Sequence, residues 1–363
     1  MKSVQHPFGN DPRKIDGYRA FWNRDPVKRP LVGFSYKSWF PIKEFRASSV
    51  WEEDTYLEPE MIDPEKFLDD QERLLKEGEE LDDDILRGAS PTQGVPWIGG
   101  MIGNSIRILP STTLAEERIL PWEQLEDLAL DTSNPWYEKY MEFTDALVRR
   151  SDGRYPVSHG TLIGPSDLIA ILRGHTQSIM DWLEEPDRAN DLLWRTTDIF
   201  QRVTEDVWKR IPLFGGGYYD AQYQLWSPGS IVRMQEDAVA VYSPELYRRF
   251  IQPVDRHLAR QFDSPFMHLH STSMFLLDAI LEVEELRCFE INIDAVAGAL
   301  TVEQMIPYFK QVQDAERSLL IRGSFSTEEM RRLVDSLDPA GLYIYVMVES
   351  SREVNELAPL MGL

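Results

Sequence analysis

Eight short segments rich in β-branched, aliphatic and aromatic residues alternate along this chain with longer segments whose apolar residues recur at helical spacing. Strands that alternate with helices predict an α/β fold with a parallel sheet, and eight is the number of strands that closes a (β/α)8 barrel. No glycine-rich turn follows the first segment, which argues against the alternative of an open dinucleotide-binding sheet. We therefore predict a single TIM-barrel domain over residues 1–363, with an N-terminal helical extension and long loops after its strands. The predicted strands are Leu31–Tyr36, Asp84–Gly88, Tyr155–His159, Ile231–Asp237, Phe266–His270, Cys288–Asn292, Leu319–Arg322 and Leu342–Val348.

Helix boundaries and loops follow from local signals. Ser326 and Glu329 have the spacing of a capping box, in which two side chains bind the first backbone amides of a helix. The longest helix is predicted over about Asp187–Arg210. Two long connections, Ser90–Asn134 and Ile211–Gly229, are predicted to form the rim of an active site, because barrels place function on the loops that follow their strands.

The balance of charge limits the kinds of partner. The chain has 61 acidic and 38 basic residues, a net charge of -23. Such a surface repels phosphate backbones, so nucleic acid is excluded as a partner. One cysteine allows no intrachain disulfide, which fits a reducing cytoplasm. No signal peptide and no apolar run of membrane-spanning length is found, so we expect a soluble cytoplasmic protein that does not enter the membrane.

Two neighbouring predicted strands each carry an apolar face and a polar one. His268 and His270 share one face of the fifth strand, and Cys288, Glu290 and Asn292 share one face of the sixth, because side chains alternate along a strand. Two imidazoles on one face, with a carboxylate on the next strand, are typical of a site for zinc or another divalent metal that keeps an open position.

Further polar residues share the predicted lumen, where branched apolar side chains are the rule. Burying such a set is costly unless its members pair with one another or hold a ligand, and both interpretations stay open. Glu349, just after the last strand, is a candidate fourth metal ligand. Trp97 and Tyr218, in the long loops, are candidates for stacking on a flat substrate. The lumen set is His159, Arg233, Gln235, Asp237, His268, His270, Glu290, Asn292 and Arg322.

Several segments resemble the uroporphyrinogen decarboxylase-like superfamily, which includes cobalamin-dependent methyltransferases. The resemblance is clearest from Tyr155 to Leu363. It is carried by Gly164-Pro165-Ser166-Asp167-Leu168 with Leu172-Arg173-Gly174, by Gln235-Glu236-Asp237 followed by Tyr242-Ser243-Pro244-Glu245-Leu246-Tyr247, by His268-Leu269-His270, and by Val95-Pro96-Trp97-Ile98.

The resemblance implies a (β/α)8 barrel with its site at the top of the barrel. In the methyltransferase branch a zinc ion activates a thiol acceptor, held by His-x-Cys on one strand, in some members a Glu on the next, and a Cys near the last. By position His268 matches the histidine, His270 replaces the first cysteine, Glu290 matches the glutamate, and Glu349 stands where the last cysteine would be. The resemblance also implies a corrinoid protein or a pterin as methyl carrier.

Three hypotheses follow from these observations. The first is an enzyme that transfers a methyl or alkyl group to or from a small molecule, with a metal on His268, His270, Glu290 and Glu349. The second is a metal-free decarboxylase-like enzyme, and the third a non-catalytic barrel that binds a small ligand or a corrinoid partner. A homodimer is compatible with each. In the first, Asp237, His270 and Glu290 are the catalytic residues, and the substrate-binding residues are Arg233, Arg322, His159, Asn292, Tyr218 and Trp97.

Overall fold

The computed structural model describes residues 6–36, 41–294 and 299–363. Its centre is a curved sheet of six strands in the order β1-β11-β10-β9-β8-β7, in which every neighbouring pair is parallel. Six of the eight predicted strands are thereby confirmed, each within a few residues. They are β1 (Leu31–Tyr36), β7 (Ile231–Gln235), β8 (Ser264–His270), β9 (Cys288–Asn292), β10 (Ser318–Gly323) and β11 (Leu342–Val348).

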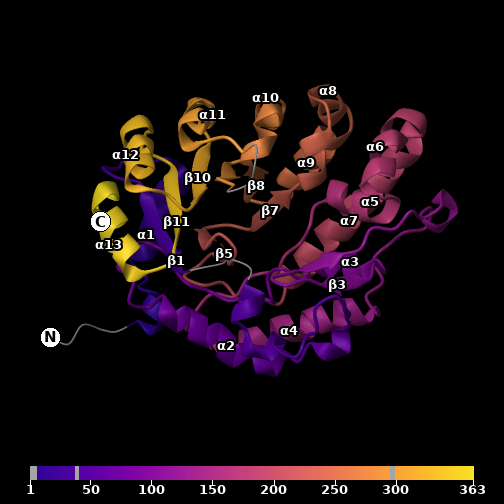
Figure 1. Ribbon diagram of the computed structural model, residues 1–363, viewed down its shortest axis with the longest axis horizontal. Coiled ribbons are helices and arrows are strands. Elements are labelled where there is room, and N and C mark those ends of the chain that lie inside the picture. Colours follow the sequence, from indigo (N-terminus) through magenta and orange to yellow (C-terminus); the bar gives the residue numbers. More distant parts are fainter. Residues whose placement is uncertain (1–5, 37–40, 295–298) are drawn as a thin grey trace.

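Helices cover the outer side of this sheet and flank the rest of the molecule (Figure 1). The predicted capping box of Ser326 and Glu329 is confirmed at the start of α12, and the predicted longest helix is α7. No helix in the described part of the chain is both long enough and apolar enough to cross a bilayer. The helices are α1 (Lys14–Asn23), α2 (Pro64–Glu77), α3 (Trp97–Met101), α4 (Pro135–Ser151), α5 (Pro165–Arg173), α6 (His175–Glu184), α7 (Pro186–Trp208), α8 (Pro244–Leu246), α9 (Gln252–Ala259), α10 (Leu277–Leu281), α11 (Val302–Asp314), α12 (Thr327–Ser336) and α13 (Ser351–Leu357).

The other two predicted strands, 84–88 and 155–159, are not part of this sheet. They approach each other at one isolated parallel bridge between Ala89 and Val157. Among the described residues the sheet therefore ends at β1 and β7, and a closed ladder of eight strands is not shown. The coarser prediction of an α/β fold built on a parallel sheet with an N-terminal helix is confirmed.

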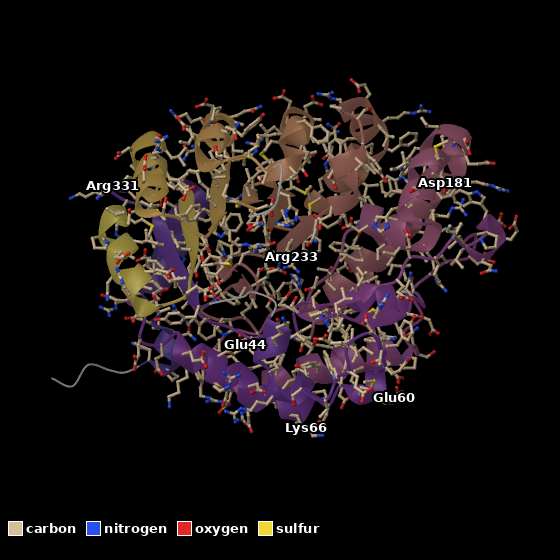
Figure 2. The ribbon with its side chains drawn as sticks, viewed as in Figure 1. Glu44, Glu60, Lys66, Asp181, Arg233 and Arg331 are labelled. Atoms are coloured by element: carbon tan, nitrogen blue, oxygen red, sulfur yellow. The ribbon has the colours of Figure 1, made fainter. Side chains whose placement is uncertain are left out.

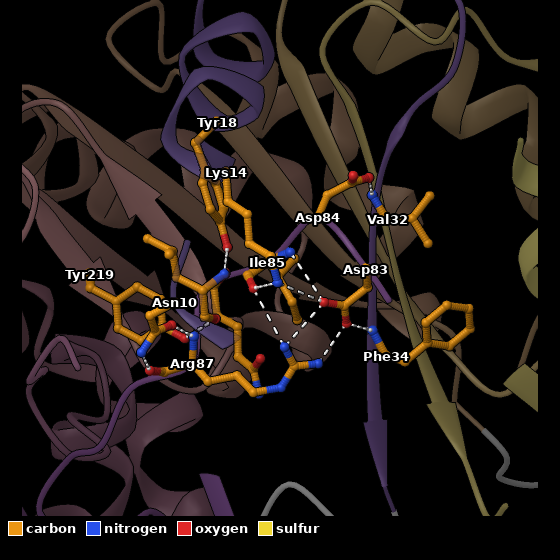
Figure 3. A network of polar contacts seen from close by, with 12 residues as sticks. Asn10, Lys14, Tyr18, Val32, Phe34, Asp83, Asp84, Ile85, Arg87 and Tyr219 are labelled. Atoms are coloured by element: carbon orange, nitrogen blue, oxygen red, sulfur yellow. Dashed lines mark hydrogen bonds and ion pairs between the residues drawn. The ribbon is translucent and has the colours of Figure 1, made fainter. Parts of the chain in front are cut away.

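Two aspartates explain why the segment after α2 does not extend the sheet (Figure 3). The backbone N–H of Val32 donates to Asp84 Oδ2 at 3.0 Å, and that of Phe34 donates to Asp83 Oδ2 at 3.1 Å. In a regular ladder these amides would bind carbonyl oxygens of the neighbouring strand. The Asp83 carboxylate also pairs with the buried guanidinium of Arg87. Side-chain acceptors thus bind two amides at this edge of β1, and the only backbone bond that the described segment 82–88 makes to β1 runs from the N–H of Asp84 to the carbonyl of Val32 at 3.0 Å.

A β-hairpin fills part of the concave side of the sheet. It consists of β5 (Tyr218–Asp220) and β6 (Leu225–Ser227), which pair antiparallel. The Tyr18 hydroxyl of α1 donates to the carbonyl of Gln224, and the Tyr343 hydroxyl of β11 donates to the carbonyl of Tyr223. The prediction that 211–229 forms a rim loop is wrong, because this segment follows α7 and precedes β7. It enters from the amino-terminal side of the strands, and Tyr223 at its tip is fully buried.

Smaller elements complete the fold. A three-stranded antiparallel sheet lies in the connection between β1 and α4, where its strands pair in the order β2-β3-β4. Short helical turns follow β7 and β8, directly after the carboxyl ends of these two strands. The strands are β2 (Tyr56–Leu57), β3 (Ile106–Ile108) and β4 (Thr113–Ala115), and the turns are η6 (Asp237–Val241) and η8 (Ser271–Leu276).

Candidate functional site

A pair of histidines stands at the carboxyl end of β8, on the concave side of the sheet. His268 is buried and lies opposite Glu290 of β9, while His270 is partly exposed and lies opposite Asn292. Because alternate residues of a strand share a face, both imidazoles point the same way. Their Nε2 atoms face each other at 3.2 Å. This confirms the prediction that His268 and His270 share one face of the strand.

Both imidazoles are held from behind by carboxylates. His268 Nδ1 contacts Glu290 Oε2, and His270 Nδ1 lies 2.8 Å from Asp294 Oδ1. A carboxylate accepts a hydrogen bond, so in each ring the N–H lies on Nδ1 and the lone pair on Nε2. Two lone pairs facing each other at 3.2 Å repel unless a proton or a metal ion lies between them. The arrangement therefore calls for a cation at this point.

The electrostatics around His270 favour positive charge. Burial lowers the pKa of His270, but the hydrogen bond to Asp294 and the charges of Asp237 and Glu290 outweigh it and raise this pKa above its usual value. Burial alone would raise the pKa of Asp294, yet hydrogen bonds from His270, Ser271 and other neighbours hold it at about 2. Asp294 is therefore ionised at neutral pH and stabilises a cation on or beside His270.

Asp237 completes a group of ligand atoms suited to a metal ion. Its Oδ1 lies 3.8 Å from His270 Nε2, and one ligand atom from each of Asp237, His268 and His270 lies within 4.8 Å of the others. Two nitrogen ligands about 2.0 Å from a tetrahedral zinc lie roughly 3.3 Å apart, close to the 3.2 Å of the histidine pair. Two histidines and one carboxylate are a common set for a divalent metal with open positions. The residues present fit such an ion.

Of the four predicted metal ligands, the structure brings His268 and His270 together in one ligand group, which does not include the other two. Glu290 lies behind His268, on the side away from His270, where it orients the ring. Glu349 is exposed, lies outside the ligand group, and its backbone N–H donates to Glu353. Cys288 is fully buried on β9, and burial raises the pKa of its thiol. The group thus contains Asp237 where the sequence suggested Glu290 and Glu349.

Arg322 neutralises the buried charge of Glu290. Its Nε lies 3.7 Å from Glu290 Oε1 and donates to Asn292 Oδ1 at 3.3 Å. The guanidinium also lies over the ring of Tyr223, 4.8 Å from the ring centre, and the Tyr223 hydroxyl is 3.0 Å from His268 Nδ1. Only 3 % of Arg322 is exposed. It is therefore engaged within the protein, whereas the sequence suggested that it binds substrate.

Arg233, which Figure 2 shows near the centre of the molecule, forms a second buried network with His159. Arg233 donates to Gln222 and lies 3.8 Å from Asp220, and His159 Nε2 lies 3.4 Å from the same carboxylate. Burial lowers the pKa of His159 to about 4, so this ring is neutral at pH 7. In this half of the lumen the two predicted substrate-binding residues face a buried carboxylate of the protein itself, although His159 Nε2, Asp220 Oδ2 and Arg233 Nε have no hydrogen-bond partner.

One aromatic candidate, Trp97, lies in the core, and the other, Tyr218, is partly buried against it. Trp97 is fully buried at the start of α3 and packs against Tyr140 and Trp136 of α4. Tyr218 of β5 packs against Trp208 at the end of α7, with ring centres 4.9 Å apart. In this structure neither residue reaches the histidine pair.

Buried acids fix the turn that carries Asp237. Asp167 Oδ1 accepts the backbone N–H of Ala238 at 2.7 Å, and Glu236 Oε2 accepts that of Ser166 at 2.8 Å. Burial raises the pKa of both carboxyls well above their usual values. These contacts explain why the Gly-Pro-Ser-Asp and Gln-Glu-Asp segments that stand out in the sequence lie side by side.

Sequence reasoning missed two residues of the site. Asp294 lies on the same alternating phase as Glu290 and Asn292, so continuing that phase past the strand end could have found it. Tyr223 gave no such signal, because it belongs to a hairpin between a helix and a strand, where no periodicity places its side chain.

No model of a known protein family matches this sequence, and no curated protein matches it either. Among solved structures, a methyltransferase from Methanosarcina mazei is similar to it, with a TM-score of 0.63 over 95% of this chain and 96% of that chain. The two sequences are 13% identical. The likeness covers nearly the whole of both chains and concerns the fold.

Proposed function

We propose that this protein is a metal-dependent enzyme that transfers a methyl or alkyl group to or from a small molecule, and that it belongs to the uroporphyrinogen decarboxylase-like superfamily. The observation that carries the proposal is the pair of imidazoles with facing Nε2 atoms and carboxylates behind both rings. The full-length fold likeness to a methyltransferase supports the type of reaction.

Each residue of the site has a role that follows from its position. His268, His270 and Asp237 would hold a divalent ion, which when bound supplies Lewis acidity that lowers the pKa of a substrate heteroatom. Glu290 and Asp294 orient the two rings. Asp237 is the exposed member of the group, so its carboxylate can also accept a proton from a substrate at the open side.

The ligand set suggests which heteroatom is activated. The only cysteine of the chain is buried on β9 outside the group, so no thiolate contributes to the site. Nitrogen and carboxylate ligands make a harder site than thiolates do. We propose an oxygen or nitrogen nucleophile, with a corrinoid protein or a pterin as the alternative carriers of the methyl group.

The decarboxylase-like alternative has less support. It needs arginines that bind substrate carboxylates, but Arg233 and Arg322 are 1 % and 3 % exposed. Each lies beside a buried carboxylate of the protein itself. A polycarboxylate substrate would also have to approach a chain with a net charge of -23.

Metal content of the purified protein tests the proposal. We expect one divalent ion per chain in the wild type, and its loss in His268→Ala/His270→Ala and in Asp237→Ala. His257→Ala on α9 and Glu349→Ala are the matched controls, which should keep the ion. No bound metal after reconstitution with zinc, iron(II), cobalt or manganese would refute the proposal, and so would an ion kept by the double variant.

A further inference from the structure

The β5–β6 hairpin brings one side chain to the back of the histidine pair. Tyr223 lies between the two strands of this hairpin and is fully buried. Its hydroxyl oxygen is 3.0 Å from His268 Nδ1, the ring nitrogen that also contacts Glu290. Barrel sites are usually built from the loops that follow the strands. This contact comes instead from a segment that precedes β7, and Figure 1 shows β5 inside the curve of the sheet.

The backbone of the hairpin tip is held by three elements. The N–H of Tyr223 donates to Asp220 Oδ1 of β5 at 2.9 Å, and its carbonyl accepts the Tyr343 hydroxyl of β11 at 3.1 Å. The Tyr18 hydroxyl of α1 donates to the next carbonyl, that of Gln224, at 2.6 Å. These contacts fix the position from which the Tyr223 side chain projects.

The ring of Tyr223 is packed as firmly as its backbone. Phe266 of β8 meets it edge to face, with ring centres 5.5 Å apart. The guanidinium groups of Arg322 and Arg233 lie over the ring, 4.8 Å and 5.6 Å from its centre. Cations in this position are attracted by the ring face. The hydroxyl is therefore directed toward His268 by a side chain that is held on several sides.

The hydroxyl oxygen also links the histidine pair to the buried network around Arg233. Gln222 accepts a hydrogen bond from Arg233 and donates its own N–H to the Tyr223 oxygen at 3.3 Å. A phenol oxygen can accept from a second donor as well, and the N–H on His268 Nδ1 lies within reach. That N–H is then shared between Tyr223 and Glu290, an arrangement known as a three-centre hydrogen bond. Two acceptors restrict the rotation of the imidazole more than one does.

We propose that Tyr223 is a positioning residue for His268: its hydroxyl, held by Gln222, fixes the imidazole so that Nε2 points at the proposed metal position. This inference rests on the proposed metal centre and deepens it. Outer partners of metal-ligating histidines typically contribute about 10–100-fold to metal affinity. Because Glu290 holds the same nitrogen, we expect an effect at the lower end of this range for the hydroxyl.

Tyr219 of β5 provides a matched control in the same hairpin. It is fully buried, and its hydroxyl donates to the carbonyl of Leu86 at 2.8 Å. Figure 3 shows it beside Asn10 and Arg87, in the contacts that join the hairpin to the segment after α2. Tyr223→Phe and Tyr219→Phe thus each delete one buried, hydrogen-bonded hydroxyl.

Zinc affinity, measured for the full-length protein by competition with a chelator, tests the role of Tyr223. Tyr223→Phe should bind zinc about tenfold more weakly, still at one site per chain, and Tyr219→Phe should bind it like the wild type. Equal affinities in all three proteins would refute the proposal. Equal weakening in both variants would show a general effect of the hairpin and would refute it too.

A measurement without metal separates this inference from the metal centre. In metal-free protein with isotope-labelled histidine, NMR reports the ring nitrogens of His268, which are assigned by comparison with His268→Gln. These resonances should shift in Tyr223→Phe and stay unchanged in Tyr219→Phe. Unchanged resonances in Tyr223→Phe would refute the positioning role. Wild-type protein that binds no zinc would refute the metal centre, and the His268 resonances would still decide whether Tyr223 holds the ring.

A second variant keeps the test valid if Tyr223→Phe does not fold. Gln222→Leu removes the donor to the Tyr223 hydroxyl and keeps the tyrosine. It should shift the His268 resonances and weaken zinc binding in the same direction as Tyr223→Phe. Resonances and affinity equal to those of the wild type would refute the proposal.

Discussion

At the scale of single residues, the orientation of two imidazoles depends on two carboxylates that lie outside the proposed ligand group. Glu290 and Asp294 bind the Nδ1 atoms of His268 and His270 and so turn both Nε2 lone pairs toward one point. Such outer partners fix the tautomer and the ring angle of metal-ligating histidines. If the proposed metal site is correct, their effect can be separated from ligation, because replacing them would weaken the site without removing a ligand.

Glu290→Gln and Asp294→Asn should therefore each weaken metal affinity by about 10–100-fold while leaving one site per chain. A competition titration with a chromogenic chelator measures this affinity. Glu349→Gln, which changes a carboxylate outside the group, is the control and should have the affinity of the wild type. Unchanged affinity in both Glu290→Gln and Asp294→Asn would show that the carboxylates do not orient metal ligands.

Asp255 makes stability depend on pH in an unusual direction. Burial raises its pKa to about 7, although the hydrogen bond from the Tyr247 hydroxyl acts the other way. The folded chain thus keeps a proton that the unfolded chain loses above about pH 4. The stabilising effect is complete below that pH and is lost as pH rises through about 7.

Asp255→Asn is neutral at every pH and should remove this dependence. Between pH 5 and pH 8 the wild type should lose on the order of 2 kcal/mol of unfolding free energy that the variant does not lose. Urea denaturation at the two pH values measures the difference. Exposed Asp198→Asn should behave like the wild type. A wild type that gains stability relative to Asp255→Asn on going to pH 8 would contradict the raised pKa.

At the scale of elements, the carboxylates of Asp83 and Asp84 bind amides at the edge of β1 where a neighbouring strand was predicted. Asp83→Ala would leave the N–H of Phe34 without its acceptor and the buried guanidinium of Arg87 without its ion pair. Removing one partner of a buried pair costs about 3–5 kcal/mol, so we expect a loss of this size. Adjacent Asp82→Ala, at an exposed position, should change stability by less than about 0.5 kcal/mol. Chemical denaturation of both variants tests the claim, and equal stability would contradict it.

The same element shows how far the sequence could predict the fold. The segment 84–88 has the composition of a strand, and nothing in its local pattern reveals that Asp83 and Asp84 bind the amides of β1. By contrast, β8 and β9 alternate cleanly, so the sequence predicted that His268, His270 and Glu290 share the concave side. Asp237 was predicted to face the same lumen, but its position within one ligand group with His268 and His270 was not predicted, because the turn that carries it is held by Asp167, far away in sequence.

At the scale of the whole molecule, net charge opposes compactness. A chain with a charge of -23 repels itself, and this repulsion acts over longer distances than its surface ion pairs. Many of these pairs are exposed, such as Arg352 with Glu356 and Arg332 with Glu328, and such pairs contribute little. Added salt should therefore weaken the long-range repulsion more than it weakens the attraction within the exposed ion pairs.

We expect the midpoint of thermal unfolding to rise when ionic strength is increased from about 0.01 M to about 0.15 M, since the screening length falls from about 30 Å to about 8 Å. A gain of about 1 kcal/mol corresponds to a few degrees for a chain of this size. Scanning calorimetry with sodium chloride at pH 8 measures the change. At pH 5, where part of the acidic charge is protonated, the rise should be smaller. A midpoint that falls with added salt at pH 8 would show that attractive pairs, and not net repulsion, dominate the surface.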